Sequence, residues 1–305
     1  MRVALCFPGQ GSQAPGMAEG LFDVPAAAPL LAAAADAGLD LESALHRADE
    51  DSLRATEVAQ PALLFVESVL RTLLPPDLDV AGVAGHSVGE YAAAVAAGVL
   101  DPSSAMRLVV QRGRAMASMR DGGMAAVIGM DSEPLEVICE EVRSDTGEIV
   151  VVANLNAPGQ VVISGSLAGL DEAGRRAREA GARRVLPLNV SGAFHSPLMH
   201  EAAVGFAALL DAADLHDASP PVVCNVDAEA VTNGDELRER LRRQLESPVR
   251  WSDSVLALRA LGATMLVEVG PGAVLTGLAR RIAPELETHN VRTAAEAAAF
   301  AAVTA

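Results

Sequence analysis

The 305-residue sequence predicts an α/β protein in which a small domain is inserted into a larger one. At residues 80–98 a buried strand, a tight glycine-containing turn and a helix follow one another without a linker. Over residues 124–188 strand and helix patterns alternate in the order βαββαβ. Half of the residues are hydrophobic, so the chain can bury the core of one large domain or two unequal ones without disulfides.

The larger domain begins with an apolar run at residues 3–7 that ends at Pro8 and Gly9, a pattern typical of a strand followed by a turn. Five further elements are expected before residue 122: an alanine-rich helix at 26–37, a helix at 60–74 that stops at Pro75 and Pro76, a buried strand at 80–85, a helix at 90–98 and a second helix that carries residues 107–114.

The pattern changes at Gly122, where the predicted elements become shorter and alternate more quickly. Strands are expected at 124–130, 149–153, 161–165 and 185–188, with helices at 134–143 and 170–181. These roughly 70 residues match a split-βαβ, ferredoxin-like unit. We therefore predict a small inserted domain over residues 122–190.

The chain then returns to the larger domain, which we predict to comprise residues 1–121 and 191–305. Further strands are expected at 220–225 and 264–269, with an arginine-rich helix at 236–245 between them. No pattern in residues 286–305 predicts a particular element.

Composition excludes several classes of protein. The formal net charge is −17 and all 23 basic residues are arginine, so a phosphate backbone would be repelled and nucleic-acid binding is not expected. The three cysteines, Cys6, Cys139 and Cys224, are far apart, which argues against a disulfide framework or a zinc site. The first apolar run is too short for a signal peptide, and no stretch approaches the roughly 20 apolar residues of a membrane span. We expect a cytoplasmic protein with no membrane contact and no bound metal.

Residues 85–89 read Gly-His-Ser-Val-Gly, the G-x-S-x-G pattern of a nucleophile elbow. The glycines permit a sharp turn that lifts the Ser87 hydroxyl out of the sheet, and the turn leaves the amide of Val88 free to donate to an oxyanion. The alternative is a glycine-rich strand-to-helix turn whose serine only caps the helix. The strand before the motif and the helix after it favour the elbow.

A serine nucleophile needs a base, and His195 is the best candidate among the six histidines because it lies where a strand passes into a loop. His86 is adjacent to the serine but its side chain should point away from it. The remaining histidines are expected on the surface or on the helix after Pro197: His46, His200, His216 and His289.

Arg112 is the third candidate. Helical spacing places it on the side of Leu108 and Val109, whereas Arg114 should face outward. A guanidinium on an inward face near an acylating serine indicates a bidentate clamp for a carboxylate, with a salt-bridged surface arginine as the alternative.

Six motifs occur together in this order and spacing, and their combination resembles the malonyl-CoA:acyl-carrier-protein transacylase family over residues 3–282. They are Phe-Pro-Gly-Gln-Gly-Ser-Gln at 7–13, Gly-His-Ser-Val-Gly-Glu at 85–90, Gln-Arg-Gly at 111–113, Asn-Leu-Asn-Ala-Pro-Gly-Gln at 154–160, Gly-Ala-Phe-His at 192–195 and Glu-Val-Gly-Pro-Gly at 268–272.

The resemblance implies a role for each candidate residue. Ser87 would be the nucleophile, His195 its base and Arg112 the holder of the free malonyl carboxylate. Gln10 would supply a second oxyanion amide opposite that of Val88. The resemblance further implies that the main-chain carbonyl of Gln244 orients the histidine, and that Phe194, directly before it, accompanies selectivity for malonyl over methylmalonyl groups.

The family's fold, a large α/β-hydrolase-like domain with a small ferredoxin-like insertion, agrees with the division drawn from pattern. The implied reaction moves a malonyl group from malonyl-CoA to the phosphopantetheine thiol of an acyl carrier protein, with no cofactor on the enzyme. Two alternatives share the catalytic residues: an acyl hydrolase that clears carrier proteins, and the malonyl-transferring subunit of a malonate decarboxylase complex. The family leaves the acceptor open between fatty-acid and polyketide synthesis.

Overall fold

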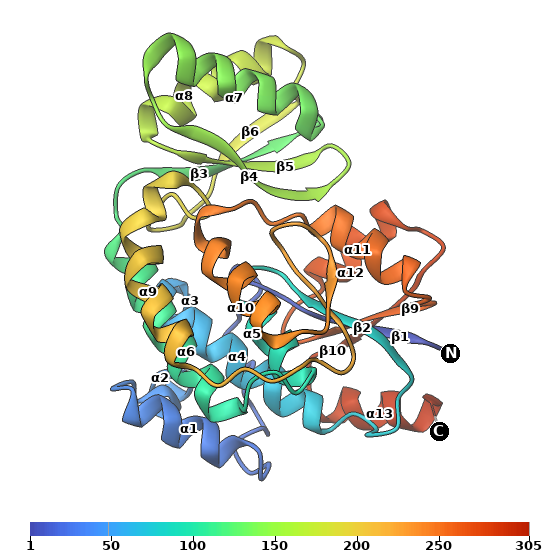
Figure 1. Cartoon of the computed structure of the whole chain (residues 1–305). Helices are drawn as coiled ribbons and strands as arrows, with labels where there is room; N and C mark the ends of the chain where they lie inside the picture. Colours follow the sequence, from blue (N-terminus) through green and yellow to red (C-terminus); the bar gives the residue numbers. More distant parts are fainter. Residues whose placement is uncertain (48, 305) are drawn as a thin grey trace.

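The computed structural model describes residues 1–47 and 49–304. It contains a six-stranded sheet in the order β10-β9-β1-β2-β7-β8 and a four-stranded sheet in the order β4-β5-β3-β6. In Figure 1 the smaller sheet, with α7 and α8, lies at the top and the larger sheet with its helices lies below it. The chain is therefore a mixed α/β protein built on two separate sheets, each of which packs against helices of its own.

The larger sheet is parallel except for its last strand. β1 pairs with both β2 and β9, β10 extends the sheet beyond β9, and β7 extends it beyond β2, while β8 is antiparallel to β7. The strands are Val3–Phe7 (β1), Val80–Gly85 (β2), Val222–Val223 (β7), Ala230–Val231 (β8), Met265–Val269 (β9) and Glu287–Val291 (β10). Because β1 and β2 are parallel neighbours and Phe7 is opposite Gly85, the loops that follow both strands leave the same edge of the sheet.

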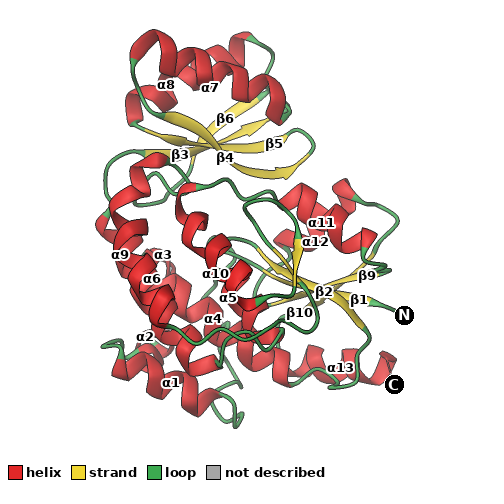
Figure 2. Cartoon of the chain, viewed as in Figure 1, coloured by secondary structure: helices red, strands yellow, loops and turns green. Residues whose placement is uncertain are grey.

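Helices cover both faces of this sheet (Figure 2). They are Ala27–Asp36 (α1), Leu41–His46 (α2), Glu50–Arg54 (α3), Thr56–Thr72 (α4), Gly89–Ala96 (α5), Pro102–Ser118 (α6), His200–Ala212 (α9), Gly234–Arg243 (α10), Trp251–Ala260 (α11), Val274–Ile282 (α12) and Ala294–Thr304 (α13), with 3₁₀ turns at Pro197–Met199 (η1) and Gln244–Glu246 (η2). No helix in the described residues is both long enough and apolar enough to cross a membrane.

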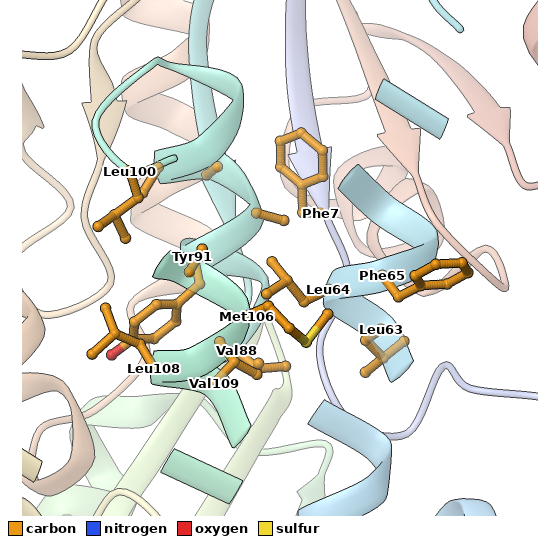
Figure 3. Close-up of a cluster of buried hydrophobic side chains, with 14 of the residues drawn as sticks. Phe7, Leu63, Leu64, Phe65, Val88, Tyr91, Leu100, Met106, Leu108 and Val109 are labelled. Atoms are coloured by element: carbon orange, nitrogen blue, oxygen red, sulfur yellow. The ribbon is translucent and has the colours of Figure 1, made fainter. Parts of the chain in front are cut away.

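The main core lies where α4, α5 and α6 pack beside β1. Figure 3 shows Phe7 of β1 above Leu64 of α4, with Tyr91 of α5 and Met106 of α6 in the same cluster. Tyr91 and Phe7 are fully buried. A second cluster around Trp251 packs α11 and α12 against the opposite face. Burial of apolar side chains on both faces fixes the central strands, and with them the loops at their carboxyl ends.

The four-stranded sheet is antiparallel and comprises Gly123–Ile128 (β3), Val150–Ala157 (β4), Gln160–Gly165 (β5) and Arg184–Pro187 (β6). Ser132–Thr146 (α7) and Leu167–Glu179 (α8) share a separate apolar cluster with these strands. The element order is βαββαβ, as the sequence pattern predicts. The other side of β4 contacts the larger part of the chain, since Asn154 forms a bridge with Val249.

Three segments differ from the sequence-based expectation. The helix expected at 60–74 begins at Thr56, and Pro61 lies inside it. The strand expected at 220–225 is reduced to Val222–Val223, because Pro220 and Pro221 have no N–H with which to pair and the chain turns directly after Cys224. Residues 286–305 contain β10 and α13, for which no pattern was recognised.

Candidate active site

Ser87 lies in a sharp turn between β2 and α5 with a positive φ of 52°. The flanking glycines are required by close backbone packing, since a Cβ on Gly85 would lie 1.9 Å from Gly89 C, and one on Gly89 would lie 2.2 Å from Phe7 O. The serine is not a helix cap: Val88 occupies the N-cap position of α5 and no side-chain cap bond is made. The turn therefore presents the hydroxyl as an elbow does.

His195 also has a positive φ, 59°, and its ring is almost fully buried. Its Nε2 lies 2.8 Å from Ser87 Oγ, and its Nδ1 lies 2.9 Å from Gln244 O and 3.1 Å from Ser247 O. Both Nδ1 partners are carbonyls, so Nδ1 carries the proton and Nε2 accepts from the serine hydroxyl. Burial and, secondly, the charge of Arg112 lower the pKa of His195 to about 3, so the imidazole is neutral at physiological pH.

The amides of Gln10 and Val88 are both free of hydrogen bonds within residues 1–47 and 49–304. Gln10 lies in the loop after β1, where its side-chain Nε2 donates to Thr56 Oγ1 at 3.2 Å. This loop packs closely on the elbow, because a Cβ on Gly9 would lie 2.5 Å from His86 O. Two free donors on neighbouring loops beside a serine hydroxyl are suited to stabilise an oxyanion.

Arg112, on α6, is fully buried. Its NH1 donates to Gln60 Oε1 at 2.6 Å, and its NH2 donates to Gln244 Oε1 at 2.9 Å and reaches Ser87 Oγ at 3.2 Å. Its guanidinium lies 5.6 Å from the centroid of the Tyr91 ring. No carboxylate of the described residues forms a salt bridge with it, although a buried cation ordinarily has an anionic partner. Arg114, two residues later, is exposed, as helical spacing predicts.

A cavity of about 220 Å³ opens between the two sheets in front of Ser87. Gln10, Val88 and His195 line it near the serine, and Phe194 forms part of its wall. Side chains of two helices and of the smaller sheet supply much of the rest, among them Met116 of α6, Leu278 of α12, Met124 of β3 and Val162 of β5. Apolar walls around one polar end suit an acyl group whose reactive carbon lies at the serine.

His86 contacts neither Ser87 Oγ nor Arg112. Its Nε2 lies 2.9 Å from Asn156 Oδ1 of β4, and its ring lies near that of Trp251, so it joins the elbow to the smaller sheet. The expectation that this side chain points away from the serine is confirmed.

Several residues of the site were not identified from the sequence. Gln60 and Glu90 are buried polar residues within apolar helices, and a polar residue in such a pattern indicates a position with a functional or structural partner. Asn225 accepts from the Ser87 amide at 2.8 Å through Oδ1, and the side chain of Gln244, in addition to its carbonyl, contacts the site. No group of three His, Cys, Asp or Glu residues in the described part of the chain could hold a metal ion.

Comparison with known proteins places the chain in a family. Residues 5–298 match the family model described as the acyl transferase domain. A malonyl CoA-acyl carrier protein transacylase of Bacillus subtilis is 43% identical over 94% of this chain and 92% of its own length. The corresponding protein of Escherichia coli is 42% identical over 93% of this chain and 94% of its own length.

Solved structures give the same result. The malonyl-CoA:ACP transacylase of Synechocystis has a TM-score of 0.88 and 40% identity, covering 98% of this chain and all of that chain. A malonyl-transacylase in complex with its type II polyketide synthase acyl-carrier protein has a TM-score of 0.92 and 37% identity, covering 99% of this chain and all of that chain. The chain therefore belongs to the acyl transferase family and, within it, to the malonyl-CoA:acyl-carrier-protein transacylases.

Proposed function

We propose that this protein transfers a malonyl group from malonyl-CoA to the phosphopantetheine thiol of an acyl carrier protein through an ester on Ser87. The observation that carries the proposal is the buried guanidinium of Arg112, which has no anionic partner among the described residues and whose NH2 lies 3.2 Å from Ser87 Oγ. A dicarboxylic acyl group would supply the missing anion while presenting its thioester to the serine.

In the first half-reaction His195 Nε2 takes the Ser87 proton as Oγ attacks the thioester carbon. The amides of Gln10 and Val88 donate to the resulting oxyanion, an interaction worth roughly 3 to 4 kcal/mol per donor in related chemistry. The C–S bond then breaks, and the coenzyme A sulfur receives the proton from His195. Hydrogen bonds to the carbonyl oxygens of Gln244 and Ser247 stabilise the imidazolium that forms in between.

In the second half-reaction the phosphopantetheine thiol gives its proton to His195 and attacks the malonyl ester. The ester C–O bond breaks and Ser87 Oγ regains the proton. Arg112 holds the malonyl carboxylate through both steps, so the same residue selects the acyl group and positions the ester. The protein's own residues suffice for this cycle, and we propose that it uses no cofactor.

Three finer assignments are part of the proposal. We assign residues 1–121 and 191–305 to an α/β-hydrolase-like domain and residues 122–190 to a ferredoxin-like domain, which the parallel sheet around the elbow and the βαββαβ order support. We also propose a cytoplasmic location, and fatty-acid or polyketide synthesis as the pathway. We propose neither a nucleic-acid partner nor a membrane partner for this acidic protein.

The two alternative functions share the dyad but differ in acceptor. A hydrolase acting on simple acyl chains has no use for a buried cation beside the nucleophile, so Arg112 disfavours it. A malonate decarboxylase subunit would use the same acyl group and a different carrier.

One experiment separates these functions. The protein is incubated with malonyl-, methylmalonyl-, acetyl- and butyryl-CoA, the acyl group that remains on it is identified by intact mass, and holo carrier proteins are then added. We expect a stable malonyl-enzyme that an acyl carrier protein discharges. Rapid loss of the ester to water without a carrier would instead identify a hydrolase.

Phe194 is expected to make the enzyme prefer malonyl over methylmalonyl groups. Its buried ring lines the cavity next to His195, where it occupies volume that a C2 methyl group would need. One methylene is usually worth about 1 to 3 kcal/mol, so we expect a preference of roughly ten- to two-hundredfold. Competition between the two CoA thioesters should show this preference in the wild type and reduce it in Phe194→Ser. An unchanged ratio in the variant would place selectivity elsewhere.

A further inference from the structure

Glu90 is a buried carboxylate within the site that the transfer cycle does not use. It lies in the first turn of α5, three residues after the nucleophile, and is 1% exposed. Its oxygens accept from Gln244 Nε2 at 2.5 Å and, more weakly, from the Asn225 amide at 3.4 Å. It forms no salt bridge with the described residues, so only neutral N–H groups stabilise its charge directly.

The Gln244 side chain connects Glu90 to the rest of the site. Its Nε2 donates to Glu90 and to Ser87 O at 3.0 Å, and its Oε1 accepts from Arg112 NH2 at 2.9 Å. An ionised carboxylate offers acceptors only, so Glu90 turns the amide nitrogen of Gln244 toward itself and the amide oxygen toward Arg112. The reversed amide would place its NH₂ against the N–H groups of the guanidinium.

Asn225 makes a second connection. The backbone N–H of Asn225 donates to Glu90. In its side chain, Oδ1 accepts from the Ser87 backbone N–H at 2.8 Å and Nδ2 donates to Gly85 O at 2.6 Å. Gln244 and Asn225 together therefore hold both the N–H and the C=O of Ser87. A positive φ at a non-glycine residue persists only where surrounding contacts enforce it, and here both contacts lead to Glu90.

The same arrangement offsets part of the charge of Arg112 without a direct ion pair, since the guanidinium donates to the neutral amide oxygens of Gln60 and Gln244. The negative charge of Glu90 acts on the guanidinium through the Gln244 amide, whose dipole lies between the two charges. A direct Glu90–Arg112 pair would compete with a substrate carboxylate for the charge, whereas neutral amide oxygens are weaker competitors that an anion can displace.

We propose that ionised Glu90 is a positioning residue, which acts through Gln244 and Asn225 to orient Arg112 and to hold the strained Ser87 peptide. The inference rests on the proposed malonyl transfer and adds a requirement to it: the transfer runs only while Glu90 carries its charge.

Burial raises the pKa of Glu90 to about 7, while hydrogen bonds from Gln244 and Asn225 and the charge of Arg112 oppose that rise. The other titratable groups near it are Asp227 and Cys224 after β7 and Tyr91 on its own helix. The carboxylate form, and with it activity, is present above this pKa and lost as the pH falls through it. Because the pKa of His195 is lowered to about 3, the base stays neutral over the same range.

The test is the pH profile of Ser87 acylation by the malonyl thioester of N-acetylcysteamine, which has no phosphate that titrates in this range. Thiol release is measured under single-turnover conditions from about pH 5 to about pH 8 in wild type, Glu90→Gln and Glu90→Asp. In wild type we expect kcat/KM to fall about tenfold per pH unit below the pKa of Glu90. Glu90→Gln should be at least tenfold slower than wild type at high pH and show no such fall, and Glu90→Asp should retain it.

Glu67→Gln is the matched control. Glu67 is another fully buried glutamate with a raised pKa, caused by burial and by the nearby charge of Glu268, but neither of its oxygens has a hydrogen-bond partner in the site. This variant should keep the wild-type pH profile. Thermal melting of every variant checks that it is folded.

The inference is overturned if the activity of Glu90→Gln falls near the pH at which the wild-type activity falls. It is also overturned if the wild-type activity shows no such fall. If Glu90→Gln is folded but too slow to measure, Glu90→Asp decides: a retained fall supports the inference and a flat profile contradicts it. Wild-type protein that accepts no malonyl group at Ser87 would instead contradict the proposed function, so the two failures are distinct.

Discussion

Ser87→Ala should form no acyl-enzyme with malonyl-CoA while keeping its fold. Among residues 1–47 and 49–304 the hydroxyl has hydrogen-bond partners only in His195 Nε2 and Arg112 NH2, and it takes no part in the hydrophobic core. Alanine retains the Cβ and tolerates the positive φ of this position no worse than serine does. Without the attacking oxygen no ester can form, so we expect transfer to fall by a factor on the order of 10⁵ or more. Intact mass after incubation with malonyl-CoA measures this directly.

Ser103→Ala is the control for this substitution. Ser103 lies on α6, its hydroxyl donates to Pro29 O at 3.3 Å, and it does not line the cavity. It should be acylated like the wild type. A Ser87→Ala protein that still gained a malonyl mass would show that the acyl group resides on another residue.

The catalytic serine and its elbow were predictable because their determinants are local. The glycines at 85 and 89 are needed within a five-residue segment, and β2 and α5 have clear apolar patterns on either side. The βαββαβ order of residues 123–187 was predictable for the same reason, since each of its strands and helices has its own periodicity.

The strand β10 was not predictable from such a pattern. Its sequence Glu-Thr-His-Asn-Val has only Val291 fully buried, so it lacks an apolar run or a clean alternation. It is a strand because it lies at the edge of the sheet and pairs with β9. Pairing with a neighbour can override weak local propensity, particularly at an edge.

The contacts around Gln244 were beyond sequence reasoning because they join residues far apart in the chain. The Gln244 side chain meets Glu90 across 154 positions and Arg112 across 132. Resemblance to a family supplied the role of the Gln244 carbonyl, but no spacing in the sequence indicates what its side chain contacts. Buried polar residues on apolar helices are the only local signal, and they indicate that partners exist without identifying them.

Arg112→Ala should lose malonyl transfer far more than acetyl transfer. Only the malonyl group carries a second carboxylate, and removing the partner of a buried charge costs about 3 to 5 kcal/mol. We therefore expect the ratio of malonyl to acetyl acylation rates to fall by about a hundredfold or more. Single-turnover acylation of Ser87 by malonyl-CoA and by acetyl-CoA, measured side by side, gives this ratio.

Arg114→Ala is the matched control, since Arg114 lies on the same helix, is exposed, and donates to the carbonyl oxygens of Ala37 and Gly38. It should leave the ratio unchanged. An equal loss of both activities in Arg112→Ala would mean that the arginine only supports the structure.

The acetyl rate in Arg112→Ala also tests the electrostatics of the base. Arg112 is one of the two largest causes of the lowered pKa of His195, so its removal should raise that pKa and make the imidazole a stronger base. A malonyl carboxylate bound to Arg112 would neutralise the same charge, whereas an acetyl group cannot. In the wild-type enzyme His195 would therefore be a weaker base when acetyl-CoA is bound than when malonyl-CoA is bound. We therefore expect acetyl acylation at Ser87 to be unchanged or faster in Arg112→Ala. If the rate rises, and the rise is absent when the same substitution is made in His195→Ala, the effect is assigned to the histidine.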